Sequence, residues 1–145
     1  MLKSVAILLA VMLVVFVADQ SLKSLFVEGF RYYTNCIDLI LVFNKGVAFS
    51  MFAFLAESLK WLQLALLAGV VGYTLWLKEN RYLIPVGIMV GAGLSNVIDR
   101  FVHGGVVDYV YWHCGFNFAV FNFADVMIDM AVLWLFILNY TAKKV

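Results

Sequence analysis

Polar side chains that could do chemistry gather in the last third of this sequence, between apolar runs: Asn96, Asp99, Arg100, Asp108, Asn122 and Asp125. If folding brings Asp108 and Asp125 together at a low-dielectric boundary, their carboxyl groups share one proton, because both cannot ionise readily. The ionised carboxylate can take a proton from water as the water attacks a carbonyl, and the protonated carboxyl can donate to the developing oxyanion. The pattern favours the chemistry of an aspartic peptidase.

The composition indicates where such a site must be built. Of 145 residues, 66% are hydrophobic and 13% are charged, whereas an ordinary soluble domain has about 45–50% apolar and about 25% charged residues. The net charge of +1 leaves no cationic surface suited to a nucleic acid. We therefore expect an integral membrane protein that binds no nucleic acid.

Four charge-poor stretches can become membrane helices, which need about 20 mostly apolar residues each. We expect these spans near residues 2–19, 58–77, 82–100 and 124–142, within a single domain of residues 1–145. The first stretch also has features of a secretory signal. Because Phe16, Val17 and Ala18 lack the small-x-small pattern of a cleavage site, we expect it to remain as the first span.

Consecutive spans alternate in direction, so one face of the membrane receives these charged residues at span ends: Asp19, Glu57, Lys60, Asp99 and Asp125. The opposite face receives Lys3, the turn at residues 78–81, Lys143 and Lys144. Lys and Arg are equally numerous on the two faces, so the positive-inside rule alone does not decide the orientation. The opposite face has only short basic segments close to the helix ends, which favours the prediction that this face lies in the cytoplasm.

Two long connections belong to the acid-rich face. Residues 20–58 contain β-branched and aromatic runs at Phe30–Tyr33 and Leu39–Phe43, followed by the turn signal Asn44-Lys45-Gly46, and predict a small sheet lying on the membrane. Residues 100–124 are rich in Phe, Tyr and Trp, which suit the lipid headgroup region. This second connection predicts a loop lying on the bilayer.

The acidic residues also have a structural interpretation. Asp125 stands where a helix begins, and could be a cap or first-turn acid with no catalytic role. The other aspartates could pair with Lys23, Lys45 or Arg100. Because charges at a membrane boundary are expensive and these gather on one face, the set as a whole favours function.

Other chemistries have weaker support. Ser50 and Ser95 could be nucleophiles, but neither lies in a glycine-flanked nucleophile elbow. His103 and His113 could bind a metal with a nearby aspartate, yet no close ligand spacing on a helix accompanies them. Water would then be the nucleophile, and we expect no metal and no organic cofactor.

Cys36 and Cys114 both fall on the acid-rich face, where a bridge is chemically allowed if the compartment is oxidising. A disulfide also needs the two Cα atoms to lie close together, and the sequence does not establish this. We expect two free thiols.

Two features of the spans concern packing and tuning. Gly87 and Gly91 have the small-xxx-small spacing of close helix contacts, which we expect to be intramolecular. Asp129 lies one helical turn from Asp125 on the same face, deeper in the membrane. It is either a paired or protonated side chain facing the bundle interior, or a group that tunes the carboxyl pair.

Taken in order, five stretches resemble the motifs of the bacterial lipoprotein signal peptidases (signal peptidase II): Asp19-Gln20-Ser21-Leu22-Lys23, Asn44-Lys45-Gly46-Val47-Ala48-Phe49-Ser50, Asn96-Val97-Ile98-Asp99-Arg100, Gly105-Val106-Val107-Asp108-Tyr109 and Phe121-Asn122-Phe123-Ala124-Asp125. The chain departs from the family pattern where Ala92 and Ser95 replace glycines. Tyr109 replaces the usual Phe, which places a hydroxyl where it could hydrogen-bond to Asp108. Asp129 has no counterpart in the pattern.

The resemblance implies an all-α membrane protein with four transmembrane helices, a small periplasmic β-sheet between helices 1 and 2, and a periplasmic loop between helices 3 and 4. It implies an aspartyl endopeptidase of the bacterial inner membrane, with its active site at the periplasmic face and both termini cytoplasmic. The substrates would be diacylglyceryl-modified prolipoproteins, cut just before the lipidated cysteine by a monomer in membrane lipid.

The resemblance also assigns residues. Asp108 and Asp125 correspond to the catalytic aspartates, and the residues that shape the site and hold substrate correspond to Asp19, Lys23, Asn44, Gly46, Asn96, Asp99, Arg100 and Asn122. Two other functions remain open on the residues alone. A binding or transport module would distribute acids along the depth of the spans, and a metal-dependent hydrolase would be sensitive to chelators.

Overall fold

A computed structural model describes residues 2–46 and 56–142 of the chain. It contains four helices that are long and apolar enough to cross a membrane: α1 (Leu2–Val27), α2 (Ala56–Leu77), α3 (Leu83–Val102) and α4 (Phe123–Ala142). A short 3₁₀ turn, η3 (Asn80–Tyr82), precedes α3. Ser50, the other residues of its motif from Val47 onward, Lys143 and Lys144 lie outside the described residues.

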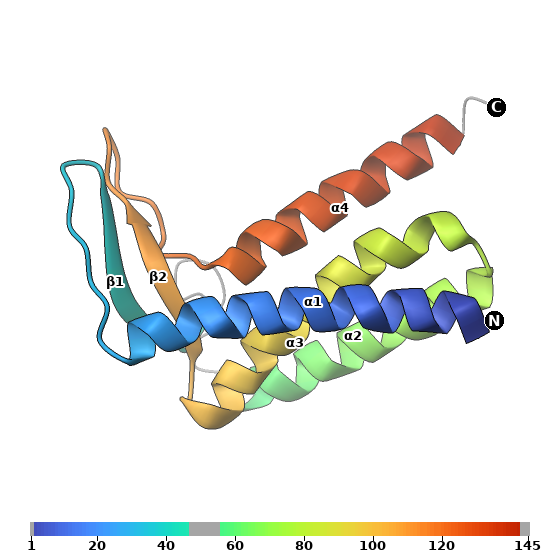
Figure 1. Cartoon of the computed structure of the whole chain (residues 1–145), viewed down its shortest axis with the longest axis horizontal. Coiled ribbons are helices and arrows are strands. Elements are labelled where there is room, and N and C mark those ends of the chain that lie inside the picture. Colours follow the sequence, from blue (N-terminus) through green and yellow to red (C-terminus); the bar gives the residue numbers. More distant parts are fainter. Residues whose placement is uncertain (1, 47–55, 143–145) are drawn as a thin grey trace.

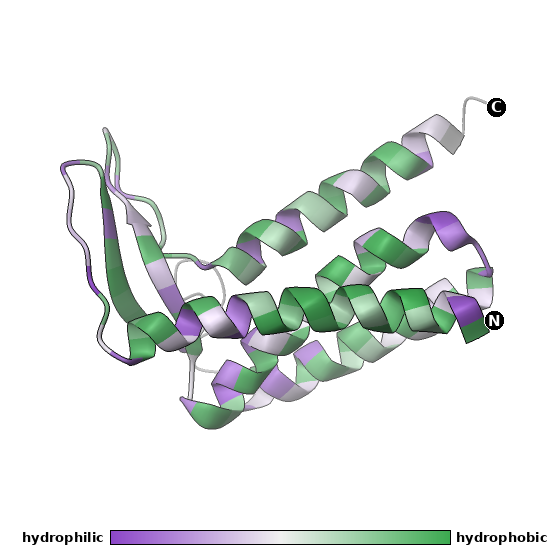
Figure 2. Cartoon of the chain, in the orientation of Figure 1, coloured by the Kyte–Doolittle hydropathy of each residue, from purple (hydrophilic) through white to green (hydrophobic). Residues whose placement is uncertain are grey.

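The helices correspond to the four expected spans and define a multi-pass membrane protein, with hydrophobic residues along most of their length (Figure 2). The largest difference is at the first span, where α1 continues past residue 19 to Val27. Asp19 therefore lies well inside the helix rather than at its end, and Lys23 lies within the helix rather than beyond it. This extension carries the polar side chains of α1 toward the sheet.

Helix α3 is the centre of the bundle, and α1, α2 and α4 each pack against it. Two-thirds of its most apolar window (67%) is buried, against 17% or less for the other three helices, whose outer faces suit contact with lipid. Gly87 and Gly91 let α1 approach closely, as expected for intramolecular packing. A Cβ at Gly91 would collide with the backbone of Met12, and one at Gly87 would lie 3.0 Å from Cβ of Val11.

A two-stranded antiparallel sheet stands at one end of the helices (Figure 1). Strand β1 (Ile37–Asn44) comes from the first connection and β2 (Val106–Trp112) comes from the second, with Asn44 opposite Val106. The expected small sheet is present, but its second strand lies in the connection that was predicted to be a loop. Both faces of β2 are buried near its start, so its sequence lacks the alternation that marks a strand with one exposed face.

A disulfide joins Cys36 to Cys114 at the far end of this sheet, so the expectation of two free thiols is wrong. The pairing of Ile37 with Trp112 brings the flanking residues together, and the backbone N–H of His113 donates to the carbonyl of Cys36. The Cα atoms of the two cysteines are 4.4 Å apart. The strand pairing ends at Ile37 and Trp112, and the disulfide just beyond this pair joins the two connections covalently.

We expect Gly91→Ala to lower the thermal unfolding temperature of the purified protein in detergent. The added methyl would push against the backbone of Met12, and overpacking of this kind costs about 1–3 kcal/mol. Gly69→Ala in α2 is the matched control, because a Cβ there meets nothing within 4 Å. It should leave the unfolding temperature unchanged or slightly higher, since Ala is the better helix former. Equal unfolding temperatures for Gly91→Ala and the wild type would contradict the close α1–α3 contact.

Candidate active site

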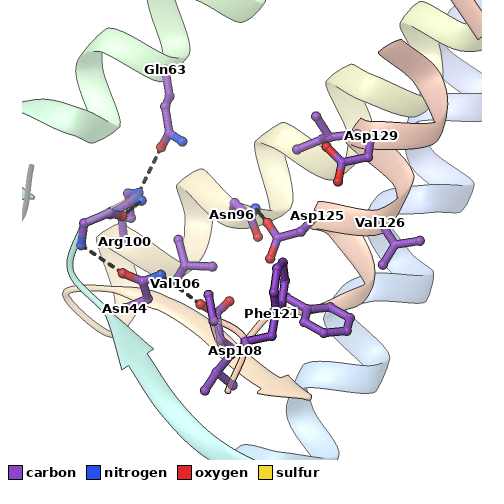
Figure 3. Close-up of a pocket in the computed structure, with 15 residues that line it drawn as sticks. Asn44, Gln63, Asn96, Arg100, Val106, Asp108, Phe121, Asp125, Val126 and Asp129 are labelled. Atoms are coloured by element: carbon purple, nitrogen blue, oxygen red, sulfur yellow. Dashed lines mark hydrogen bonds between the residues drawn. The ribbon is translucent and has the colours of Figure 1, made fainter. Parts of the chain in front are cut away.

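Asp108 of β2 and Asp125 in the first turn of α4 line one pocket of about 400 Å³ (Figure 3). Asn122, which is fully buried, connects them. Its side-chain Nδ2 donates to Oδ1 of Asp108 at 2.7 Å, and its backbone N–H donates to Oδ2 of Asp125 at 3.0 Å. The structure thus brings the two aspartates together, as the sequence predicted.

The position of Asp125 follows from the way α4 begins. Asn122 precedes the helix, and its Oδ1 accepts the backbone N–H of Asp125 at 2.9 Å, while Asp125 accepts the backbone N–H of Asn122 in return. This reciprocal arrangement is a capping box. The structural interpretation of Asp125 is therefore correct, and it does not compete with a role in chemistry, since the cap holds the carboxylate in the pocket wall.

The Asp108 side chain is almost completely buried and accepts hydrogen bonds from Nδ2 of Asn44 at 3.0 Å and Nδ2 of Asn122. Burial and the nearby charge of Asp125 raise the pKa of the Asp108 carboxyl to about 7, although the two amide donors and Lys23 act in the opposite direction. A carboxyl with this pKa holds its proton for a large part of the time at neutral pH. The pair can therefore contain one acid and one base.

The ammonium group of Lys23 is buried and is connected to the carboxyl pair through Asn96. Lys23 Nζ is 2.7 Å from Oδ2 of Asp19 and 2.6 Å from Oδ2 of Asp99, and the three side chains are at most 3% exposed. Lys23 also donates to Oδ1 of Asn96 at 2.7 Å, while Nδ2 of Asn96 donates to Oδ1 of Asp125 at 3.0 Å. Lys23 therefore sets the orientation of the amide that holds Asp125.

The two acids of this cluster also connect separate elements. Asp19 accepts the backbone N–H of Ala124 at the start of α4, and Asp99 accepts the backbone N–H of Val107 in β2. Both elements that carry the candidate catalytic residues are thus tied to the same buried ion cluster.

Arg100 has a different role from the one suggested by its charge. It donates from Nε to Oε1 of Gln63 at 2.9 Å, and from its terminal nitrogens to the backbone carbonyls of Lys45 and Gly46. No carboxylate in the described part of the chain accepts a hydrogen bond from it, so the alternative in which Arg100 pairs directly with an aspartate is not the one found. Together with the bond from the Gly46 N–H to Oδ1 of Asn44, these contacts hold the end of β1 over the pocket.

Two hydroxyl groups lie in places that the sequence did not predict. The Tyr109 hydroxyl accepts the backbone N–H of Phe123 rather than bonding to Asp108, because successive strand residues face opposite sides. Burial raises the Tyr109 pKa to about 12, so the phenol stays neutral. Ser95 is fully buried, and its hydroxyl donates to Oδ2 of Asp19 at 2.6 Å.

Sequence reasoning missed three positioning residues: Gln20, Gln63 and Ser95. Nε2 of Gln20 donates both to Ser95 and to Oδ1 of Asp99 at 2.8 Å. Each of the three residues is a polar side chain within a membrane helix, and polarity in an apolar span is the signal that could have found them.

The histidines lie away from the pocket. His113 is 3.3 Å from Asp38 beside the disulfide, and the ring of His103 stacks on Phe43. Within residues 2–46 and 56–142, no group of three or more His, Cys, Asp or Glu side chains is placed to hold a metal ion.

Four membrane helices with a carboxyl pair at their end, one member of it buried, are the arrangement expected of a membrane-embedded aspartic peptidase. The signal peptidase (SPase) II family model matches residues 11–141. Lipoprotein signal peptidases from Sulfurimonas denitrificans and Helicobacter pylori are 67% and 51% identical to the chain, over 89% and 98% of its length and 84% and 92% of theirs. The chain belongs to the signal peptidase II family, which confirms the resemblance found in its motifs.

A solved structure described as a bacterial membrane enzyme has the same fold, with a TM-score of 0.81 and 19% sequence identity over 97% of this chain and 89% of the other. At this identity the likeness concerns the fold.

We expect Lys23→Met to destabilise the protein by about 3–5 kcal/mol, because it leaves Asp19 and Asp99 buried without their counter-charge. Thermal and denaturant unfolding in detergent would measure the change. Lys45→Met is the matched control, since the Lys45 side chain is exposed and only its backbone carbonyl binds Arg100. If the two variants unfold alike, the buried ion cluster does not hold the fold together.

Proposed function

We propose that this chain removes the signal peptide from diacylglyceryl-modified prolipoproteins by cutting just before the lipidated cysteine. The observation that carries the proposal is the pair Asp108 and Asp125, held by Asn122 at the wall of one pocket at the ends of the membrane helices. Relatives with half or more of their residues identical bear the name lipoprotein signal peptidase. The family supports the substrate, and the geometry of the pocket supports the assignment of the catalytic residues.

The chemistry requires only water and the two carboxyl groups. Asp125 accepts a proton from a water molecule while the water oxygen bonds to the scissile carbonyl carbon, and Asp108 donates its proton to the carbonyl oxygen. As the tetrahedral intermediate collapses, the C–N bond breaks and the proton taken by Asp125 passes to the departing amine of the lipidated cysteine. The hydroxyl proton of the intermediate returns to Asp108, which restores the starting state of the pair.

The lining of the pocket fits a substrate that remains in lipid. Apolar side chains from β2, from the segment before α4 and from α4 itself surround the polar centre: Val106, Phe118, Val120, Phe121, Val126 and Ile128. A low-dielectric wall of this kind strengthens the electrostatic interactions of the carboxyl pair. We place the acyl chains in the bilayer and the scissile bond at the pair.

We also propose the inner membrane as the location, with the sheet and the site at the periplasmic face and both termini in the cytoplasm. The Cys36–Cys114 disulfide supports this orientation, because disulfides persist in the periplasm and are rare in the cytosol. The chain would act as a single-domain monomer surrounded by membrane lipid.

Asp108→Asn and Asp125→Asn should each lower cleavage of a diacylglyceryl-modified prolipoprotein by about 10²- to 10⁴-fold, the range that general acid–base catalysis contributes. The assay uses purified, folded protein in detergent with a chelator present. Asp38→Asn is the matched control, because Asp38 is also an acid of the sheet but lies beside His113. The proposal fails if both site variants cut the substrate as fast as this control.

The rate should also fall as the pH rises through about 7. Below this pH Asp108 keeps the proton that it must donate, and above it the carboxyl group is ionised beside Asp125 and the pair loses its acid. A profile of kcat/KM against pH would measure the descending limb. A rate that stays constant up to strongly alkaline pH would show that Asp108 is not the acid.

A further inference from the structure

Asp129 is an acid of the pocket that the proposed chemistry does not use. It lies one turn after Asp125 on α4 and lines the same pocket, farther along the membrane span (Figure 3). Gln63 of α2 also lines this pocket, and its amide oxygen is already occupied by Arg100. Asp129 is thus the third carboxyl group of the pocket, after Asp108 and Asp125, and it lies on the side that extends into the membrane.

The carboxyl group of Asp129 is exposed, and within the described part of the chain it has neither a hydrogen-bond donor nor a counter-charge. An ionisable group in a membrane span is expensive unless something pairs with it, so such groups mark functional sites. The sequence left two forms of an interior role open, a paired and a protonated side chain, and the described residues contain no partner for the paired form.

The alternative role, tuning of the catalytic pair, has no support from the electrostatics of Asp108. The main charges that act on the Asp108 carboxyl are those of Asp125 and Lys23, Arg100 also interacts with it, and Asp129 is not among these groups. Because no described residue pairs with Asp129, we look for its partner in a molecule that enters the pocket on the membrane side of Asp125.

The substrate has such partners. A peptide bond can be cut only where the backbone is extended, and an extended segment loses its helical hydrogen bonds. In a signal peptide, the residues before the scissile bond lose these bonds while they still lie near hydrocarbon, where unpaired N–H and C=O groups are costly. A carboxyl group can accept from the N–H groups and, when protonated, can donate to the C=O groups.

We propose that Asp129 is a substrate-binding residue whose carboxyl group hydrogen-bonds to the backbone of the signal-peptide residues that precede the scissile bond. This inference rests on the proposed function and adds to it a contact on the membrane side of the carboxyl pair. It assigns to α4 two separate tasks, since Asp125 acts on the scissile bond and Asp129 holds the segment leading to it.

The test compares Asp129→Leu, Asp129→Asn and wild type in cleavage of a diacylglyceryl-modified prolipoprotein in detergent, over a range of substrate concentrations and pH. Asp129→Leu should raise KM by about fivefold to tenfold, the effect of losing one or two hydrogen bonds, with kcat nearly unchanged. Asp129→Asn should remain close to wild type, because an amide both accepts and donates. Met130→Leu, an exposed neighbour on α4, is the control and should leave both constants unchanged.

Thermal unfolding separates binding from folding. Asp129→Leu should unfold at the wild-type temperature or above it, since Leu suits a position within a membrane span better than an unpaired carboxyl group does. A wild-type KM for Asp129→Leu, or a lowered unfolding temperature, would overturn the inference. A shifted pH optimum for Asp129→Asn with an unchanged KM would overturn it in favour of tuning, and failure of the wild type to cut the prolipoprotein would overturn the proposed function instead.

Discussion

The structure depends on one buried cation. Lys23 lies within hydrogen-bond distance of Asp19, Asp99 and Asn96, all of them withdrawn from solvent. Within the described residues these groups connect α1 to α3, and the two acids also accept backbone N–H groups at the start of α4 and in β2. A buried charge that loses its partner is very costly, so each element is held in the one position that keeps Asp19 and Asp99 paired with Lys23.

This constraint explains how a site at a membrane boundary can be rigid. Asp108 and Asp125 come from a strand and a helix that are far apart in the sequence, yet Asn122 contacts both. The Asn96 side chain accepts a hydrogen bond from Lys23 and donates one to Asp125, so the position of Lys23 determines the orientation of the amide that holds Asp125. The hydrogen bonds of the pair are therefore set before any substrate arrives, which is the preorganisation that electrostatic catalysis requires.

The sheet supplies the second half of the site. Strand β1 ends at Asn44, whose amide donates to Asp108, and Arg100 holds the carbonyls of the two residues that follow. The disulfide fastens the opposite end of the same sheet. With both ends held, the hydrogen-bond partners of Asp108 do not depend on lipid, even though the protein lies in a membrane that offers few polar contacts.

The sequence by itself determined the membrane class, the four spans, the family and the polar residues of the site, because hydropathy, helix length and short motifs are local properties. It also placed Asp125 at a helix start, since a capping box is built from neighbouring residues. Only the tertiary structure decided that β2 pairs with β1, that Cys36 meets Cys114, and that Arg100 binds carbonyl groups rather than a carboxylate. Each of these depends on contacts between residues distant in the chain, and hydropathy and local motifs carry no information about which distant segments will meet.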